Sequence, residues 1–482
     1  MSPKVHRLLV PLAVCALVAA SATTAALTAG TASHDWTRFG YDAARGNAAP
    51  TGVDSSTVGS LKRRQIAIDG TVDSSPIYLA AAAVNGVRHD TVFVTTTYGK
   101  TLALDAASGR VLWRFVPRDI ATWAGSSQIT TATPVADPSR RFVYAASPDG
   151  LIHKLSVANG KQVRGRWPVR VTLDPTHEKI ASALNFSRGL LVVTTGGYFG
   201  DAPPYQGHVV TIAAATGRIV SVFNSLCSDR RTIIRPSSCK ASDSAIWGRA
   251  GAVVEPGSGN LLVATGNGPW NGKTNWGDSV LELSPDGSRL LQNWTPANQA
   301  ELERNDTDLG STSPVFLGDG LALQSGKDGL VRLLDLTRLN GRTHTAGTIT
   351  GGELQTLPVP GNTDVFTAPA VFRAGSRTWV FVTTGAGTGA FRLVGRRLSA
   401  TWQNSTGGTS PVVAGGLLYV FDPSGGGVRV YDPPSGRLLT TLAAGTGHWN
   451  SPIVADGRVI LPEGNANDHR QTGVLDIYSR AG

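Results

Sequence analysis

The residues that could do chemistry in this chain are scattered, and several common catalytic patterns are missing. The nine histidines never fall within four positions of one another, which excludes a metal-binding His-x-x-x-His helix. The sequence holds no Gly-x-Ser-x-Gly motif and no Gly-rich phosphate loop. Ser237 and Lys240 have Ser-x-x-Lys spacing, but they flank Cys239 in a loop, so we interpret that spacing as chance.

Two short polar segments carry the more interesting side chains. Asn267 lies between Gly266 and Gly268, and Asp306 and Asp308 stand two positions apart further along the chain. Asn between glycines is a common turn residue, and Asp often caps turns, so both segments can be purely structural. A functional role requires fold elements that bring the two segments together.

The first 33 residues predict an export signal. A basic start of Lys4, His6 and Arg7 precedes a run of mostly Leu, Val and Ala from Leu8 to Leu27. Small residues follow, and we expect cleavage between Ala22 and Ser33, which leaves residues 34–482 as the mature, secreted or extracytoplasmic protein. A membrane anchor that stays attached is the alternative. No later stretch has the roughly 18 apolar residues that span a bilayer.

Charge and cysteine content describe the mature chain further. It holds 42 basic and 34 acidic residues, a net charge of +8. The basic residues are dispersed without interleaved aromatics, so we expect no nucleic-acid partner, and we expect a monomer. Cys227 and Cys239 lie in a polar loop and predict a local disulfide in an oxidising compartment; two free thiols are the alternative.

A repeated motif organises the chain: a small residue, then proline, then an apolar strand. Intact copies contain Pro76, Pro134, Pro314, Pro369, Pro411 and Pro452, and degenerate copies fit near Gly189 and Gly251. Alternating strands and glycine turns follow each copy, most clearly from Tyr98 to Trp113. About four strands per ~45 residues is one propeller blade. The eight copies predict an all-β, eight-bladed β-propeller of four-stranded antiparallel blades.

The chain ends and the tryptophans complete this prediction. Residues 34–65 hold no complete blade, so we expect the two chain ends to share one blade, which closes the ring and hides its edge strands. Trp113, Trp294 and Trp402 follow turns and are expected to pack between neighbouring blades. An array of β-sandwiches would need linkers between repeats, and the sequence shows none.

These repeats resemble the pyrroloquinoline-quinone (PQQ) repeat propellers, from Asp35 to Tyr478. That family includes quinoprotein alcohol dehydrogenases and the non-catalytic outer-membrane assembly propeller, so the resemblance implies the fold more strongly than the function. The segments 246–248, 264–271, 305–310 and 325–329 resemble the dehydrogenases specifically.

The resemblance implies a role for four residues. Trp247 would stack on the quinone, Asn267 would bind calcium, Asp308 would be the catalytic base, and Lys327 would contact the quinone oxygens. In such a site Ca²⁺ is held by hard oxygen ligands and polarises a quinone carbonyl, while an aspartate takes the alcohol proton as hydride moves to the cofactor.

The sequence also departs from the dehydrogenases. Their calcium-binding glutamate should lie shortly before Gly207, where the chain has none; Asp201 is the nearest substitute ligand, beside Asn267 and Asp308. The adjacent-cysteine disulfide of many of those enzymes is absent. Two hypotheses follow. One is an exported propeller with a degenerate quinone site, which as an enzyme would oxidise alcohols or sugars. The other is a non-enzymatic scaffold that binds a protein or glycan.

Overall fold

The computed structural model describes Met1, residues 34–200 and residues 202–480. The expected signal peptide and its cleavage sites lie outside the described residues, as does Asp201. Residues His34–Gly482 form one unit by their internal contacts. Nearly all of its regular structure in the described ranges is β-strand.

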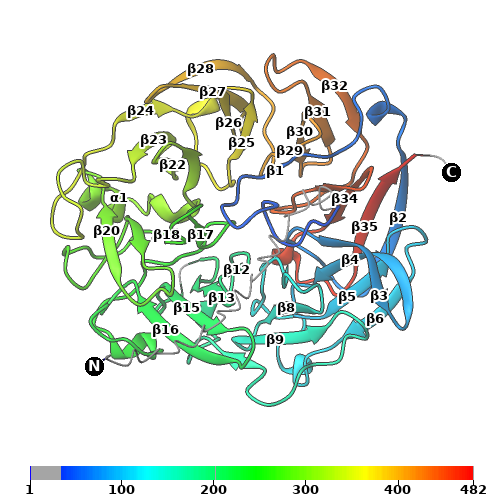
Figure 1. The fold of residues 1–482 in the computed structure, drawn as a ribbon, viewed down its shortest axis with the longest axis horizontal. Helices are drawn as coiled ribbons and strands as arrows, with labels where there is room; N and C mark the ends of the chain where they lie inside the picture. Colours follow the sequence, from blue (N-terminus) through cyan, green and yellow to red (C-terminus); the bar gives the residue numbers. More distant parts are fainter. Residues whose placement is uncertain (2–33, 201, 481–482) are drawn as a thin grey trace. The chain divides into compact units, whose positions relative to one another are not determined.

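Eight sheets follow one another around a ring (Figure 1), each with its strands hydrogen-bonded in the order given below. Blade 1 is β3 (Ile77–Val84), β4 (Val87–Thr95), β5 (Thr101–Asp105) and β6 (Val111–Phe115). Blade 2 is β7 (Val135–Ala136), β8 (Phe142–Ser147), β9 (Leu151–Ser156) and β10 (Val169–Arg170). Blade 3 is β12 (Asn185–Ser187), β13 (Leu190–Thr194), β15 (His208–Ala213) and β16 (Arg218–Asn224). Blade 4 is β17 (Val253–Val254), β18 (Leu261–Ala264), β19 (Val280–Leu283) and β20 (Leu290–Trp294).

The second half of the ring repeats this order. Blade 5 is β21 (Val315–Gly318), β22 (Leu321–Ser325), β23 (Leu330–Asp335) and β24 (Gln355–Pro358). Blade 6 is β25 (Ala370–Ala374), β26 (Arg377–Thr383), β27 (Thr388–Val394) and β28 (Arg397–Asn404). Blade 7 is β29 (Val412–Ala414), β30 (Leu417–Asp422), β31 (Gly427–Tyr431) and β32 (Leu438–Leu442), with β1 (Ala48–Ala49) added in parallel to β29. Blade 8 is β33 (Ile453–Ala455), β34 (Arg458–Glu463), β35 (Gly473–Ser479) and β2 (Lys62–Ile68).

Short elements connect the blades. The pair β11 (Glu178–Lys179) and β14 (Gly196–Gly197) forms a two-stranded ladder beside blade 3. One α-helix, α1 (Gln299–Arg304), lies in the described part of the chain, and none there is long and apolar enough to cross a membrane. The 3₁₀ turns are η1 (Val58–Ser60), η2 (Ile120–Thr122), η3 (Pro236–Ser238), η4 (Leu309–Ser311), η5 (Pro360–Asn362) and η6 (Ala466–Asp468).

The predicted ring closure is confirmed. Strand β2 pairs antiparallel with β35 over its whole length, from Lys62 opposite Ser479 to Ile68 opposite Gly473. The two ends of the propeller segment therefore meet in blade 8, where β35 lies between β34 and β2.

Contacts made by the repeat motif and by its tryptophans join neighbouring blades. The hydroxyls of Thr133 and Ser410, each directly before the proline of a repeat, accept backbone N–H bonds from Ser75 and Ala368 of the preceding blade (3.1 and 2.9 Å). The Trp113 ring packs so closely on Gly160 that a Cβ there would lie 2.6 Å from it, which explains a glycine in that turn.

The segment before β2 has a role that the repeat pattern did not predict. It crosses the ring, and its carbonyls accept backbone N–H bonds of 2.8–2.9 Å from the first strand of blades 1, 2, 4, 6 and 7. Arg45 within it is 1% exposed and donates to four backbone carbonyls, including Ala250 O and Leu184 O. This segment therefore links the first strands of five blades through hydrogen bonds.

The predicted disulfide between Cys227 and Cys239 is also confirmed. Its S–S distance is 1.98 Å, and it closes the loop between β16 and β17.

Candidate functional site

A cavity of about 550 Å³ lies among the segments that enter the blades and the loops between their second and third strands. Its lining residues come from segments far apart in the sequence, from Thr131 to Asn467. A propeller hub gathers such segments because every blade starts beside the same axis.

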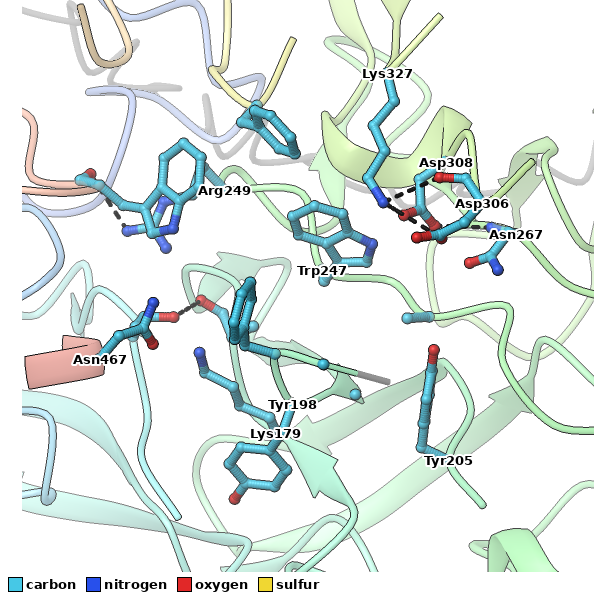
Figure 2. Close-up of a pocket in the computed structure, with 18 of the residues that line it drawn as sticks. Lys179, Tyr198, Tyr205, Trp247, Arg249, Asn267, Asp306, Asp308, Lys327 and Asn467 are labelled. Carbon is cyan, nitrogen blue, oxygen red and sulfur yellow. Dashed lines mark hydrogen bonds and ion pairs between the residues drawn. The ribbon is translucent and has the colours of Figure 1, made fainter. Parts of the chain in front are cut away.

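Trp247, Asn267, Asp308 and Lys327 all line this cavity (Figure 2). Trp247 lies in the segment before blade 4, Asn267 in the β18–β19 loop, Asp308 directly before η4, and Lys327 in the β22–β23 turn. The fold therefore brings together the four residues that the sequence singled out, and their roles remain predictions.

Asp308 and Lys327 form a close ion pair. Lys327 Nζ lies 2.5 Å from Asp308 Oδ2 and 3.4 Å from Asp306 Oδ1, and the backbone N–H of Asn267 donates to Asp308 Oδ1 at 2.8 Å. The Asp308 side chain is 6% exposed and that of Lys327 is 19% exposed. Both carboxylate oxygens of Asp308 are therefore held by donors inside the protein.

The electrostatics of this pair follow from burial and charge. Burial lowers the pKa of Lys327, but the two aspartates outweigh it and leave that pKa above its ordinary value. Burial raises the pKa of Asp308, and the Lys327 ammonium and the Asn267 N–H oppose that rise. Behind them, burial and then the charge of Asp308 raise the pKa of Asp278 well above its usual value. Burial thus raises the pKa of both carboxyls, and only Asp308 has a cation in contact to oppose the rise.

Glycine is required where the two polar segments meet. A Cβ on Gly266 would lie 2.0 Å from Asp308 Oδ1, and a Cβ on Gly310 would lie 2.4 Å from the Gly266 nitrogen. The close approach of the two backbones is what lets the Asn267 N–H reach Asp308.

Aromatic rings form one wall of the cavity. The centroids of Trp247 and Phe366 are 6.0 Å apart, and those of Phe366 and Trp449 are 5.3 Å apart. Lys327 Nζ lies 5.8 Å from the centre of the Trp247 ring, within the range of a cation–π contact. Trp247 thus offers a flat apolar surface beside the Asp308–Lys327 pair.

A second charged group, which sequence reasoning missed, lies on the other side of Trp247 (Figure 2). It consists of Lys179 in β11, Arg249 before blade 4, and Asp73 and His448 around blade 8 and the entry to blade 1. Only Arg249 gave a signal: it stands directly before the degenerate copy near Gly251, where the intact copies have an uncharged residue.

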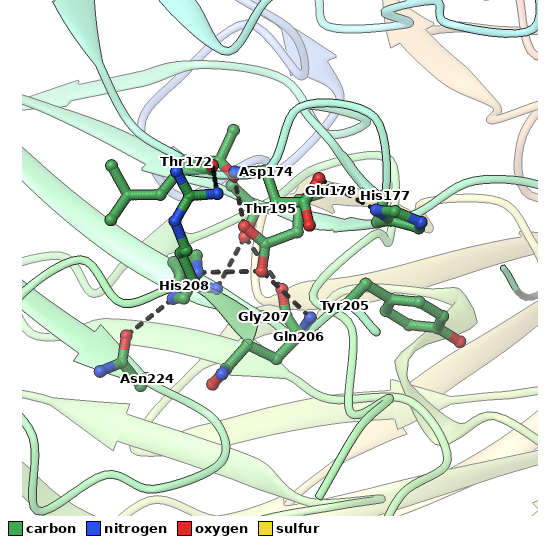
Figure 3. A network of polar contacts seen from close by, with 12 residues as sticks. Thr172, Asp174, His177, Glu178, Thr195, Tyr205, Gln206, Gly207, His208 and Asn224 are labelled. Carbon is green, nitrogen blue, oxygen red and sulfur yellow. Dashed lines mark hydrogen bonds and ion pairs between the residues drawn. The ribbon is translucent and has the colours of Figure 1, made fainter. Parts of the chain in front are cut away.

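A glutamate does lie behind the loop that lacks the family's ligand, but it does not face the cavity. Glu178 is 1% exposed; its carboxylate accepts hydrogen bonds from the Thr172 hydroxyl and from Gln206 N at 3.3 Å (Figure 3). His208 Nε2 lies 3.0 Å from it, and His208 Nδ1 is 2.7 Å from Asn224 Oδ1. Glu178 belongs to a buried structural network.

Among the described residues, which leave out Asp201, the donor set is too small for calcium. Ca²⁺ takes six to eight oxygen ligands, usually with several carboxylates. The described residues contain no group of three or more His, Cys, Asp or Glu that could hold a metal, and both oxygens of Asp308 already have partners, one of them a cation. A divalent ion beside Asp308 would meet the Lys327 ammonium.

Comparison with known protein sequences finds similar proteins. A family model described as outer membrane protein assembly factor BamB matches residues 45–222. Quinohemoprotein alcohol dehydrogenase ADH IIB of Pseudomonas putida is 25% identical over 491 residues, covering 89% of this chain and 65% of that protein. The repeats of this chain are therefore similar to those of the PQQ-repeat propellers. It spans less than two thirds of that dehydrogenase relative.

Solved structures agree on the propeller. Quinohemoprotein alcohol dehydrogenase ADHIIG of Pseudomonas putida HK5 superposes with a TM-score of 0.69 at 14% identity, covering 93% of this chain and 80% of that chain. A europium-containing methanol dehydrogenase gives 0.66 at 14% identity, covering 92% and 98%. At these identities the likeness shows the fold alone.

Proposed function

We propose that this propeller is exported and binds PQQ in its central cavity, at a dehydrogenase-type site that has lost its metal. The observation that carries the proposal is the convergence of Trp247, Asp308 and Lys327 on one cavity. The similarity to quinohemoprotein alcohol dehydrogenase over 89% of the chain supports the choice of quinone.

The cavity suits the shape and charge of this cofactor. PQQ is a flat conjugated ring system that carries carboxylates, and an aromatic face beside cations complements both features. Trp247 supplies the face, and Lys327, Lys179 and Arg249 are cations that line the same cavity. Arg249 Nε is buried without a hydrogen-bond partner among the described residues, which is the kind of group that a bound acceptor would satisfy.

Lys327 supplies a positive charge beside the proposed quinone site. Its ammonium is a fixed positive charge 2.5 Å from Asp308, inside a cavity where such a charge interacts strongly. A cation at this point can stabilise negative charge that develops on a neighbouring oxygen. The site therefore keeps an electrophilic group without a Ca²⁺ ligand set.

Bound PQQ would supply a two-electron acceptor. The chain's own residues would position the substrate and accept its proton: the Asp308 carboxylate, paired with Lys327, would take the proton of a substrate hydroxyl. Trp247 orients a planar ligand, and the backbone N–H of Asn267 fixes the Asp308 carboxylate. Alcohols and sugars are the substrate classes that this arrangement serves.

Export is part of the proposal. The amino-terminal 33 residues have the composition of a signal peptide, and the Cys227–Cys239 disulfide suits an oxidising compartment.

Reconstitution tests the proposal. Residues 34–482 are incubated with PQQ, desalted, and scanned for quinone absorbance, with Trp247→Ala as the variant and Trp276→Phe, a core tryptophan outside the cavity, as the control. We expect one quinone per chain in wild type and in the control, and loss of the quinone in Trp247→Ala. Dye-coupled oxidation of alcohols and aldoses then tests catalysis. Equal retention by wild type and Trp247→Ala would contradict the site.

A non-enzymatic scaffold is the second candidate. The match of residues 45–222 to the assembly-factor model favours it. Absence of quinone binding, together with saturable capture of one cell-envelope component by the propeller, would replace the first proposal with this one.

A further inference from the structure

At the end of the cavity opposite Asp308, the described residues carry more positive charge than their acidic groups balance. Lys179 and Arg249 both line it, and the acid nearby is Asp73. Figure 2 shows Lys179, Arg249 and Asn467 on one side of Trp247, and Asp308, Lys327 and Asn267 on the other.

Both carboxylate oxygens of Asp73 already accept hydrogen bonds. Its carboxylate accepts from His448 Nδ1 at 2.8 Å, from Trp449 N at 2.7 Å and from Ala466 N at 3.0 Å. Although burial alone would raise the pKa of Asp73, the His448 contact and the other donors hold it below its ordinary value. Asp73 therefore organises the wall of the cavity; both of its oxygens accept from other groups, and it forms no hydrogen bond or ion pair with Lys179.

Arg249 is only partly satisfied. The residue is 6% exposed, and its Nη2 donates to two backbone carbonyls, Asp73 O at 3.1 Å and Trp449 O at 3.5 Å. Its Nε is buried with no partner among the described residues. A guanidinium presents five donors in a fixed fork, so Arg249 keeps donors for an acceptor in the cavity.

Lys179 has no hydrogen bond or ion pair to any described residue through its ammonium. Its backbone is held opposite Gly196 in the β11–β14 ladder, and its side chain extends into the cavity (Figure 2). Burial lowers the pKa of Lys179 to about 8, with Asp73 opposing this shift and Arg249 adding to it. A lysine placed here without an anion is unfavourable, since it loses water and gains repulsion from a second cation.

We propose that Lys179 and Arg249 form a carboxylate-binding site at this end of the cavity. The site rests on the proposed function in one respect: the carboxylate comes either from the quinone itself or from an acidic substrate bound beside it. The shared chemistry is a carboxylate in a charge-assisted contact with an ammonium and a guanidinium. A neutral alcohol alone leaves both cations unpaired.

Lys179 is the residue to change, because Arg249 also joins two backbone carbonyls and its loss would disturb the fold. Affinity for PQQ is measured by calorimetry with Lys179→Gln, with Lys179→Arg, and with Lys161→Gln as an exposed control. We expect Lys179→Gln to bind at least about tenfold more weakly, the scale of one charge-assisted hydrogen bond, and the control to bind as wild type does.

The pH dependence separates a charge role from a packing role. The charged groups that act on Lys179 are Arg249 and Asp73, and the other charged lining residues are Asp306, Asp308, Lys327, Asp364 and His448. Because an anion binds the protonated lysine, wild-type affinity should fall about tenfold from pH 7 to pH 9. Lys179→Arg should retain affinity and lose this decline.

Malonate, a simple dicarboxylate, distinguishes the two sources and the two proposals. Malonate protection against thermal unfolding that vanishes in Lys179→Gln, without PQQ binding, supports the carboxylate site, assigns it to an acidic substrate and rejects the quinone. PQQ binding that is equal in wild type and Lys179→Gln and flat with pH overturns the carboxylate site alone. Binding of neither compound overturns both.

Discussion

Replacing Lys327 by methionine tests the charge balance of the site without any cofactor. Methionine keeps much of the side-chain length but leaves Asp308, whose side chain is 6% exposed, facing no cation at 2.5 Å. Removing one partner of a buried ion pair costs about 3–5 kcal/mol. Lys327 is 19% exposed and water can enter the cavity, so we expect a loss just below this range, about 2–3 kcal/mol at pH 7.

The assay is a double-mutant cycle by denaturant unfolding of wild type, Lys327→Met, Asp308→Asn and the double variant. The double variant should be more stable than Lys327→Met alone, because asparagine leaves no unpaired charge. The direction in which the stability loss of Lys327→Met changes with pH is also predicted. Without Lys327, burial holds the folded-state pKa of Asp308 above its unfolded value, so the loss should grow as pH rises and be smallest near pH 4.

Two results would refute this reasoning. A loss below about 0.5 kcal/mol in Lys327→Met would mean that the pair is solvated like a surface ion pair. A double variant no more stable than Lys327→Met would mean that the lysine stabilises the fold through its packing rather than through Asp308.

Three further predictions concern the surroundings of the site. Gly266→Ala should cost about 3 kcal/mol in unfolding free energy and abolish quinone retention, because its Cβ would lie 2.0 Å from Asp308 Oδ1; a stable variant that retains quinone would contradict this. Replacing both Cys227 and Cys239 by serine should lower the free energy of unfolding by about 2–3 kcal/mol, because the disulfide closes a loop. An unchanged midpoint of urea unfolding would contradict this prediction. Since its carboxylate partner raises the pKa of His208 above 6.5 against the effect of burial, the stability from that pair should be full below pH 6.5 and decline as pH rises; His208→Gln should remove the decline.

The fold could be predicted because the proline motif that marks a blade start recurs along the sequence. The proline copies near Pro76 and Pro452 mark blade starts, and the degenerate copy near Gly251 precedes β17 of blade 4. The copy placed near Gly189 was wrong by one strand, because Gly189 lies in the turn after β12. Closure through β2 and β35 followed from the absence of a complete blade before Ile68. The crossing segment around Arg45 was not predictable, since its hydrogen bonds run from one chain segment to many blades and leave no period in the sequence.

The candidate site was predictable only where it resembles the family. Trp247, Asn267, Asp308 and Lys327 stand in recognisable segments, and the fold gathers them at the hub. Lys179 and Arg249 were missed because an isolated charge near a blade start resembles a surface residue. Only the three-dimensional arrangement reveals that the Lys179 ammonium has no partner among the described residues and that both oxygens of Asp73 accept from other groups.

The most direct measurement is calorimetric titration of the protein with PQQ in excess EDTA and, in parallel, in excess Ca²⁺. A quinone site that uses the Lys327 ammonium in place of a metal predicts one site per chain and affinities within about twofold in the two buffers. No binding in EDTA with tight binding in Ca²⁺ would contradict the metal-free site, and no binding in either buffer would contradict the quinone.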